Sequence, residues 1–600
     1  MLLTVLLPAL AASLAIATAQ YDRVTVSVHA VQGTGERSPL KGAKVRVQGV
    51  VTGDFQDYGG NNHGKLGGFY IASLEPDDEP ASSEGLFVFE KGRRLLDVVP
   101  GQVVEVEGVV AEHFGETQLA ASAVRILGSA EYEAVALEFP QASLERFEGM
   151  LVHIPERLTI AGNRNLERFG ELRLSAGERP YQFTNRFAPS RSGYAASEVE
   201  LERSSLLLDD GLRRENPKHA RYAGGPVPPR AGNSITGLTG TLRWSRGSGG
   251  KGDAAFRLMP TAGVTIDATN PRPPPPERSG SLRVASFNLL NLFSGLATGE
   301  ENCGPDGKRR CRGADSPLEL ERQLQKTVAT FAQLDADIVG IMEIENNARE
   351  SLRLLQRALR ADGQDFEFVD AGVIGHGSIK VAFMYRPERV ATAGEFSLLT
   401  RAVDGRFDDR RNRPALEQTF VETASGARIS VVVNHLKSKG SDCDDANDPN
   451  RGDGQGNCNR TRTQAAAALA EWSGRRADAS ADGHALIIGD LNAYMREDPV
   501  RAIERGGFVN LLDRDIGDKA YSFVYDGRAG ALDYALASPA LAAKVRQVAE
   551  WHINADEPPL LDYNLDFGRD ATLFDAGAAW RSSDHDPVIV DIDLATNSTL

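Results

Sequence analysis

The chain has 600 residues, of which 41% are hydrophobic, and it carries a formal net charge of −16 at pH 7. A chain of this length is expected to fold into several domains with sizeable cores. Its acidic balance argues against a protein held to nucleic acid by a broad basic surface. The balance still allows an enzyme that meets phosphates through bound cations and a few local Arg or Lys side chains.

Residues 1–19 have the pattern of a secretory signal peptide. An apolar run is followed by Ala17-Thr18-Ala19, a small-x-small cleavage pattern before Gln20. The run is short for a helix that spans a membrane, and no later stretch is long and apolar enough to do so. We therefore expect a secreted protein without stable membrane insertion, in the periplasm, at the outer surface or free outside the cell.

Residues 20–130 are predicted to form a small all-β domain. Apolar residues alternate over 44–51 and 102–110, with turn glycines between the strands. The pattern resembles an OB-like barrel, a fold that often binds oligonucleotides or sugars. Aromatic residues such as Phe69 and Phe87 fit either a core or a binding face, so a structural module and a nucleic-acid grip both stay open.

Residues 131–270 are predicted to form a second β-rich domain, with the clearest strands over 150–154 and 234–242. Residues 271–280 contain a run of prolines and are interpreted as a semi-rigid linker. Little in the second domain points to a function.

The pattern changes from residue 281, where apolar strands alternate with amphipathic helices. Ser316, Pro317 and Glu319 form a capping box with proline at the first helical position, which predicts a helix to about Leu334. Strands are predicted over 282–287, 336–342, 428–434, 485–489, 531–537 and 587–592, with a helix over 460–475. This order predicts sheets packed together and flanked by helices, an α+β chain overall.

The four cysteines lie in two close pairs, Cys303 with Cys311 and Cys443 with Cys458. Neither pair has CxxC spacing or a flanking histidine, which disfavours a metal site. In an oxidising compartment each pair is expected to form a local disulfide that closes a polar loop.

Acidic, amide and imidazole side chains follow the apolar strands in six short motifs. Hydrolysis of a phosphodiester needs an attacking hydroxide, cations that screen the phosphate and stabilisation of the leaving alkoxide. Asp, Glu and Asn offer the oxygen ligands that Mg²⁺ prefers, and His can supply a proton or charge. Each residue alone is more often a solvated strand end, a turn residue or a structural histidine. The candidates are Asn288, Glu343, His435, Asp490, Asn492, Asp533, Asp584 and His585.

Taken together, the motifs resemble one family in sequence, order and approximate spacing. Residues 281–594 resemble the endonuclease/exonuclease/phosphatase superfamily, and the mature chain resembles bacterial extracellular deoxyribonucleases that carry an N-terminal OB-like domain. The resemblance implies a four-layer α/β sandwich of the pancreatic deoxyribonuclease type for a catalytic domain over 281–600. The motifs are Ser286-Phe287-Asn288, Met342-Glu343-Ile344-Glu345-Asn346, Asn434-His435-Leu436-Lys437, Gly489-Asp490-Leu491-Asn492, Leu532-Asp533-Tyr534 and Ser583-Asp584-His585-Asp586.

The resemblance also implies a metal site and a site for the attacking water. Asn288 and Glu343, with Asp584, would bind Mg²⁺ or Mn²⁺. Asp490 and Asn492 would orient the nucleophilic water and the phosphate. Many relatives have Gln at the position of Met342, directly before the metal-binding Glu343, but that Gln is not a metal ligand.

Two histidines complete the implied set of catalytic residues. His435 would act on the phosphate and the leaving oxygen, and Asp533 would support His435 or a second metal ion. Asp584 would orient His585, which would contact the phosphate or act as the base. Asp586 is interpreted as a bystander.

Several polar side chains around these motifs have two open interpretations. The loop from Asp442 to Asp453 is rich in acids and either binds Ca²⁺ or is simply solvated. Arg413, Lys437 and Arg462 either contact substrate phosphate or belong to ordinary basic segments.

The sequence thus favours a secreted, metal-dependent endonuclease that cleaves DNA with little sequence preference and leaves 5′-phosphate ends. RNA is an alternative substrate, and no obligate protein partner is evident. One rival is a phosphodiesterase or phosphatase of the same fold that acts on lipid or sugar phosphates. The other is a non-catalytic protein that binds nucleic acid at a cell surface.

Overall fold

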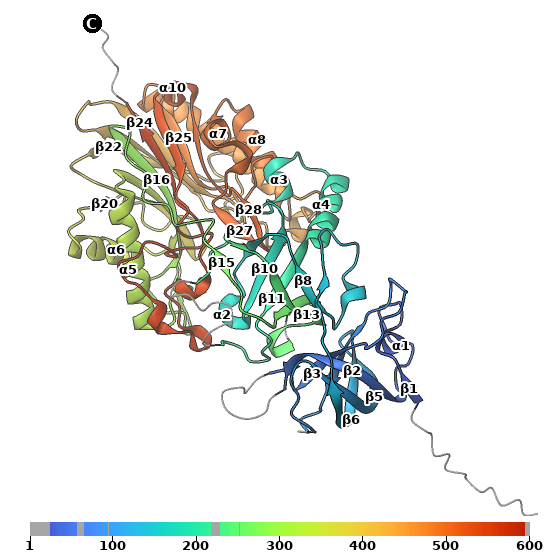
Figure 1. The fold of residues 1–600 in the computed structure, drawn as a ribbon. Coiled ribbons are helices and arrows are strands. Elements are labelled where there is room, and N and C mark those ends of the chain that lie inside the picture. Colours follow the sequence, from blue (N-terminus) through green and yellow to red (C-terminus); the bar gives the residue numbers. More distant parts are fainter. Residues whose placement is uncertain (1–23, 57–64, 94, 218–227, 251, 595–600) are drawn as a thin grey trace, which may run out of the picture. The chain divides into compact units, whose positions relative to one another are not determined.

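The computed structural model describes residues 24–56, 65–93, 95–217, 228–250 and 252–594 (Figure 1). The predicted signal peptide lies outside the described residues. The chain divides into two compact units: the first is residues 1–133 with 145–150, and the second is residues 134–144 with 151–600. In the described residues no helix is both long and apolar enough to cross a membrane. The predicted domain limits at 130, 270 and 280 stay predictions.

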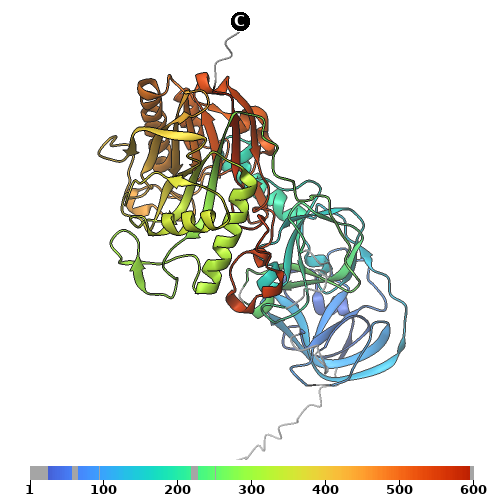
Figure 2. The ribbon, with the colours of Figure 1, turned by 90° about the vertical axis from the view of Figure 1, so that its left-hand side faces the viewer.

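The first unit contains a closed β barrel, the blue part of Figures 1 and 2. Its strands pair in the order β2-β3-β4-β6-β5, and β2 also pairs with β5, which closes the ring. Phe69 and Phe87 are buried, as core residues are. The structure therefore has a small all-β barrel here, while its likeness to OB-like domains stays a prediction. The strands are β2 (Lys44–Phe55), β3 (Gly68–Ala72), β4 (Gly85–Phe89), β5 (Gln102–His113) and β6 (Glu116–Ser129), preceded by β1 (Val24–Val26) and α1 (Val28–Gln32).

The second unit begins with a nine-stranded sheet that spans the predicted second β-rich segment. Its strand order is β15-β12-β9-β10-β11-β14-β13-β8-β7, and α4 (Arg191–Ser204) precedes β11. The strands are β7 (Val135–Ala136), β8 (Leu151–Ile154), β9 (Leu158–Gly162), β10 (Glu171–Ala176), β11 (Ser205–Asp209), β12 (Ser234–Ile235), β13 (Leu238–Ser245), β14 (Ala255–Pro260) and β15 (Ile266–Asp267).

Two six-stranded sheets follow, each with one parallel pair of strands near its centre. The first has the order β20-β21-β19-β16-β31-β30 and the second the order β22-β23-β24-β25-β29-β26. The first contains β16 (Leu282–Leu292), β19 (Ile338–Glu345), β20 (Glu367–Phe368), β21 (Ile379–Tyr385), β30 (Val545–Glu550) and β31 (Val588–Ile592). The second contains β22 (Val390–Leu399), β23 (Ala415–Glu422), β24 (Arg428–His435), β25 (Ala485–Asp490), β26 (Val509–Asn510) and β29 (Asp533–Ala537).

The two sheets pack face to face between layers of helices (Figure 1). Val284 and Met342 from the first sheet share a core with Val433 and Ile488 from the second. On its outer face the first sheet packs against α5 (Pro317–Leu334) and α6 (Glu350–Ala361), and the second packs against α7 (Asn459–Ser480), which contacts α8 (Asp498–Arg505). The predicted four-layer sandwich is confirmed.

The predicted helix starts agree with the structure, whereas one helix is longer than predicted. The Ser316 hydroxyl accepts a hydrogen bond from the Glu319 amide at 3.3 Å, which caps α5. The helix predicted over 460–475 continues to residue 480, because Ala477 is still buried against the core.

Buried polar contacts join α3 (Phe183–Arg186), which lies between β10 and β11 in sequence, to the sandwich within the second unit. The Asn185 amide nitrogen donates to the Ala520 carbonyl at 3.0 Å, and its oxygen accepts from the Ala531 amide at 3.0 Å. The Thr184 hydroxyl donates to the Glu497 carboxylate at 2.7 Å. Because buried polar groups are costly unless they are paired, these contacts fix the two parts to each other.

Candidate active site

The predicted site residues converge because neighbouring strands end in register. His435 pairs with Asp490 across the parallel strands β24 and β25, and Asp490 pairs with Asp533 across β25 and β29. In the facing sheet, Asn288 pairs with Met342, the residue before Glu343. The carboxyl ends of the parallel strands of each sheet therefore present these groups together.

The backbone takes unusual conformations where it positions these groups. Glu343 has a φ of 60°, in the left-handed region, and the pairing of β19 with β21 shifts register between Ile341 and Ile344. Such bulges aim a side chain out of the regular sheet alternation. Gly489 has a φ of 122°, and a Cβ there would lie 2.1 Å from the Asn434 carbonyl oxygen. The Asn434 backbone therefore approaches Gly489 more closely than any side chain there would allow.

His435 is 2% exposed and faces two carboxylates. Its Nε2 lies 3.4 Å from an Asp490 oxygen and 4.0 Å from a Glu343 oxygen. Asn492 donates its backbone N–H to Asp490 at 2.7 Å and its side-chain amide to the same carboxylate at 3.0 Å. Asp490 and Asn492 thus form one hydrogen-bonded group against the imidazole.

His585 is held by Asp533, which corrects two predicted contacts. The Nδ1 atom of His585 lies 2.6 Å from an Asp533 oxygen, and the same oxygen accepts from the Ser522 hydroxyl at 2.7 Å. Asp533 therefore supports His585 rather than His435, and Asp533 rather than Asp584 orients the His585 ring. The two histidines come from facing sheets, so the sequence order of the motifs could not tell which histidine the carboxylate meets.

Asp586 is structural, as predicted, and Phe523 is a residue that the motifs did not reveal. Asp586 accepts from the Asn554 and Ala555 amides at 2.7 and 3.0 Å and pairs with His552 at 2.9 Å. The Phe523 ring lies 4.6 Å from the His585 ring, centroid to centroid.

Burial and local charges set the protonation states. Burial raises the pKa of Asp490 to about 7, and the Asp533 charge adds to this rise. Burial and then Arg413 hold the pKa of His435 well below its usual value. Burial opposes charge on His585 too, but the bonded Asp533 carboxylate holds its pKa well above the usual value. One histidine is thus neutral and the other protonated near pH 7.

The three predicted metal ligands offer a donor set suited to a hard divalent cation. Burial raises the pKa of Glu343, and the neighbouring Asp584 charge raises it further. A cation between these two carboxylates would remove their repulsion and meet the oxygen ligands that Mg²⁺ prefers. Asn288 is 1% exposed and its amide oxygen accepts from the Leu290 amide at 3.0 Å, which fixes the side chain beside Glu343. The residues therefore fit a divalent metal.

The three predicted phosphate-binding side chains differ in their surroundings. Arg413 is half-buried, acts electrostatically on Glu343 and Asp490, and donates to the Leu436 carbonyl at 3.0 Å. Lys437 is half-buried next to His435. Arg462 is fully buried and donates to three backbone carbonyls, including Asn457 at 2.7 Å. The predicted substrate contact of Arg462 is therefore corrected to a structural one.

The acidic loop does not gather into a cation site. Asp448 accepts from the Thr461 amide and hydroxyl, both at 2.8 Å, at the start of α7. Asp445 pairs with Arg411 at 2.7 Å. Among the described residues, no group of three His, Cys, Asp or Glu ligands lies between Asp442 and Asp453. These acids stabilise the loop, and the predicted Ca²⁺ site finds no support in their arrangement.

Both predicted disulfides are present, Cys303–Cys311 and Cys443–Cys458. The first places the exposed Arg312 close enough to the site to lower the pKa of Arg413 and His435. Arg312 was missed because nothing in its own motif marks it; its position depends on the disulfide.

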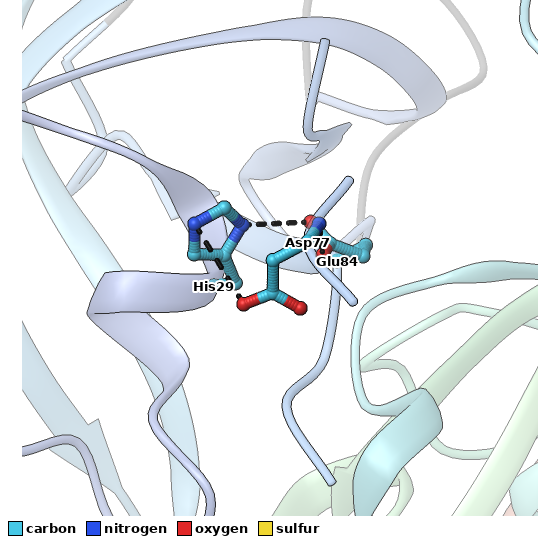
Figure 3. A group of neighbouring side chains, drawn as sticks. All are labelled: His29, Asp77 and Glu84. Carbon is cyan, nitrogen blue, oxygen red and sulfur yellow. Dashed lines mark hydrogen bonds and ion pairs between the residues drawn. The ribbon is translucent and has the colours of Figure 1, made fainter. Parts of the chain in front are cut away.

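Two other clusters in the described chain bring together three potential metal ligands, His29 with Asp77 and Glu84 in the barrel unit and a second group at α5. In the barrel cluster the two ring nitrogens of His29 face different carboxylates, at 3.2 Å from Glu84 and 3.8 Å from Asp77 (Figure 3). Each ring nitrogen of His29 thus faces its own carboxylate.

Comparison with known proteins places the site within a family. The family model described as Endonuclease/Exonuclease/phosphatase family matches residues 285–585, half of the chain. A sequence search of curated proteins finds no significant match.

Solved structures with similarity to the chain cover about half of it. They include a mannosyl-6-phosphatase from Bacteroides thetaiotaomicron, with 15% identity, 52% of this chain and 99% of that chain covered, and a TM-score of 0.34. The human Nocturnin catalytic domain has 14% identity, coverages of 53% and 97%, and a TM-score of 0.33. An AP endonuclease from Archaeoglobus fulgidus has 16% identity, coverages of 52% and 99%, and a TM-score of 0.31. Similarities this low identify no substrate.

Proposed function

The chain belongs to the endonuclease/exonuclease/phosphatase family, and from this premise we propose that it is an exported, divalent-metal-dependent nuclease that hydrolyses phosphodiester bonds of extracellular DNA. The observation that carries the proposal is the pairing of unlike protonation states. A neutral His435 faces Asp490, whose pKa is about 7, while a protonated His585 is held by Asp533.

This pairing suits an in-line attack of water on a phosphodiester. The ionised Asp490 carboxylate, fixed by Asn492, accepts a proton from the attacking water. His435 faces the same carboxylate through Nε2 at 3.4 Å, which places the neutral ring where it can stabilise the charge that develops on the phosphate. His585 presents a positive charge to a phosphoryl or leaving oxygen. The products are a 5′-phosphate end and a 3′-hydroxyl end.

Mg²⁺ or Mn²⁺ is the proposed cofactor. Glu343, Asp584 and Asn288 would hold the ion, and the ion when bound would supply positive charge against the phosphate oxygens. Arg413 adds a fixed charge near Glu343 and Asp490, and Lys437 follows His435 after one intervening residue, Leu436. Both are proposed to hold the substrate backbone.

A plasmid assay tests the proposal. Purified protein is incubated with supercoiled plasmid in millimolar Mg²⁺, with and without EDTA. We expect nicked and linear DNA with ligatable 5′-phosphate ends in Mg²⁺, no cleavage in EDTA, and recovery when excess Mg²⁺ is added. Intact plasmid together with hydrolysis of a sugar phosphate or sphingomyelin would replace the nuclease by the phosphatase rival. No hydrolysis of any substrate would favour the non-catalytic rival.

Export is proposed on the N-terminal pattern, and the two disulfides are consistent with an oxidising compartment. Expression of the full chain in a bacterial host followed by N-terminal sequencing tests it. Mature protein outside the cytoplasm should begin at Gln20, whereas uncleaved protein in the cytoplasm would contradict export.

A further inference from the structure

A large cleft in the second unit runs from the candidate active site to the nine-stranded sheet. Its volume is about 1180 Å³, above the roughly 300–1,000 Å³ of ordinary small-molecule pockets. Asp584 and Leu290 line it on the sandwich side, and Trp244 and Phe256 line it on the sheet side. A ligand whose reacting group lies at Asp584 can therefore reach the nine-stranded sheet.

The sheet side of the cleft presents an aromatic pair. Trp244 on β13 and Phe256 on β14 are cross-strand partners, half-buried, with ring centroids 4.9 Å apart in an edge-to-face arrangement. On the sandwich side, Phe523 lies against His585 and Tyr525 is 52% exposed. Aromatic rings thus occur on both walls, starting at the histidine that would meet the phosphate.

The charges of the cleft are largely paired with one another. Arg173 pairs with Asp526 at 2.8 Å and Arg257 with Glu171 at 2.8 Å. Among the described residues, the exposed Arg164 and the half-buried Arg581 are cleft arginines without an ion pair, and Arg581 donates to the Asn554 carbonyl at 3.0 Å. A surface with so little uncompensated positive charge does not suit recognition of many backbone phosphates. It suits recognition of bases, since every base offers a face for stacking.

The two walls are fixed to each other at a short hairpin. Strands β27 (Phe523–Tyr525) and β28 (Arg528–Gly530) form this hairpin, and Ala529 forms a parallel bridge with Tyr181, in the segment that follows β10. The Gln182 amide donates to the Ala529 carbonyl at 2.9 Å, and the Gln182 side chain donates to the Tyr525 carbonyl at 3.1 Å. The ion pair of Arg173, on β10, with Asp526 attaches the nine-stranded sheet itself to this hairpin, whose Phe523 lies against His585.

We propose that this cleft is a subsite for single-stranded nucleic acid, in which bases next to the scissile phosphate stack on Trp244 and Phe256. The proposal rests on the nuclease function proposed above and assigns to the nine-stranded sheet a direct part in substrate binding. Stacking of one base on an aromatic side chain contributes about 1–3 kcal/mol to binding. Loss of one stacked base should therefore lower the affinity for the substrate about 5- to 150-fold.

The test compares a polymer with a small diester. The ratio of kcat/KM for a single-stranded thymidine oligonucleotide to kcat/KM for bis(p-nitrophenyl) phosphate is measured for the full-length protein with Mg²⁺. Trp244→Ala should lower this ratio about 5- to 150-fold, while Trp244→Phe should keep most of it because it keeps a stacking ring. Phe187→Ala removes an aromatic side chain that is 60% exposed and does not line the cleft, and its ratio should equal that of the wild type.

The outcomes separate this proposal from the one on which it rests. A wild type that cleaves neither substrate would contradict the nuclease function itself. A wild type that cleaves both, with a ratio unchanged within twofold in Trp244→Ala, would overturn the subsite alone. Trp244→Leu, which fills the space without an aromatic ring, is used where Trp244→Ala fails to fold, and the same limits apply to it. An equal loss in Phe187→Ala would also overturn the subsite.

Discussion

The barrel of the first unit and the nine-stranded sheet of the second are both β-rich, but they differ in how they bury their polar and apolar groups. The barrel encloses its own core, in which Val47, Phe69 and Leu119 are buried together. The short helix α3 (Phe183–Arg186), which lies between two strands of the sheet in sequence, buries the polar side chains of Asn185 and Thr184 against the sandwich. A segment with its own core can vary without effect on the site, whereas a segment that shares buried hydrogen bonds with the site cannot.

The largest expected effect on stability belongs to the barrel and should leave activity unchanged. Leu119 is fully buried in the barrel core, so Leu119→Ala should cost about 2–5 kcal/mol of the free energy of unfolding of the barrel. Hydrogen exchange of barrel peptides should increase while plasmid cleavage keeps its rate. A cleavage rate that fell together with the barrel's protection would contradict the separation of the two units.

The next effect concerns the contact between sheet and sandwich. Asn185→Ala leaves the Ala520 carbonyl and the Ala531 amide without their partner, at about 1–3 kcal/mol each. Ala520 lies shortly before Ser522 in sequence, and Ala531 lies shortly before Asp533, the carboxylate that holds His585. We therefore expect the cleavage rate to fall at least several-fold at a temperature where the protein is folded. Thr241→Val is the matched control, because Thr241 is equally buried and its hydroxyl has no partner among the described residues. Equal rates for both variants would show that the contact does not position the site.

The smallest expected effect distinguishes two carboxyl groups that titrate in the same range. Burial raises the pKa of Asp490 and of Glu145, in the barrel unit, to about 7. For Glu145 the folded pKa lies above the usual value of 4.5, so its contribution to stability is present below pH 4.5 and is lost as pH rises through about 7. Glu145→Gln should therefore remove part of the pH dependence of barrel hydrogen exchange without changing activity.

Activity should follow Asp490 in the opposite direction. Cleavage needs the ionised carboxylate, so kcat/KM at limiting Mg²⁺ should rise with pH through a midpoint near 7, and a higher Mg²⁺ concentration should move this midpoint to lower pH. A pH profile measured in parallel for the wild type and Glu145→Gln checks this. A midpoint that moved in Glu145→Gln would contradict the assignment to Asp490.

The strand ends could be predicted from sequence because apolar runs stop where polar side chains begin, as at His435 and Asp490. Their convergence follows from register between neighbouring strands. The partner of Asp533 could not be predicted, because it depends on how two sheets that are far apart in sequence face each other. The parts played by Phe523 and Asn185 could not be predicted for the same reason, because a single aromatic or amide side chain outside the motifs carries no signal until the packing is known.

The measurement that tests the central claim most directly is the rate of Mg²⁺-dependent plasmid cleavage by His435→Gln, a variant close in size and without a titratable ring. With an unchanged melting temperature, the rate should fall by about 10²–10⁴-fold, the range for a group that moves or stabilises protons in the transition state. A folded variant whose rate stayed within a few-fold of the wild type would contradict the assignment of this cluster as the active site.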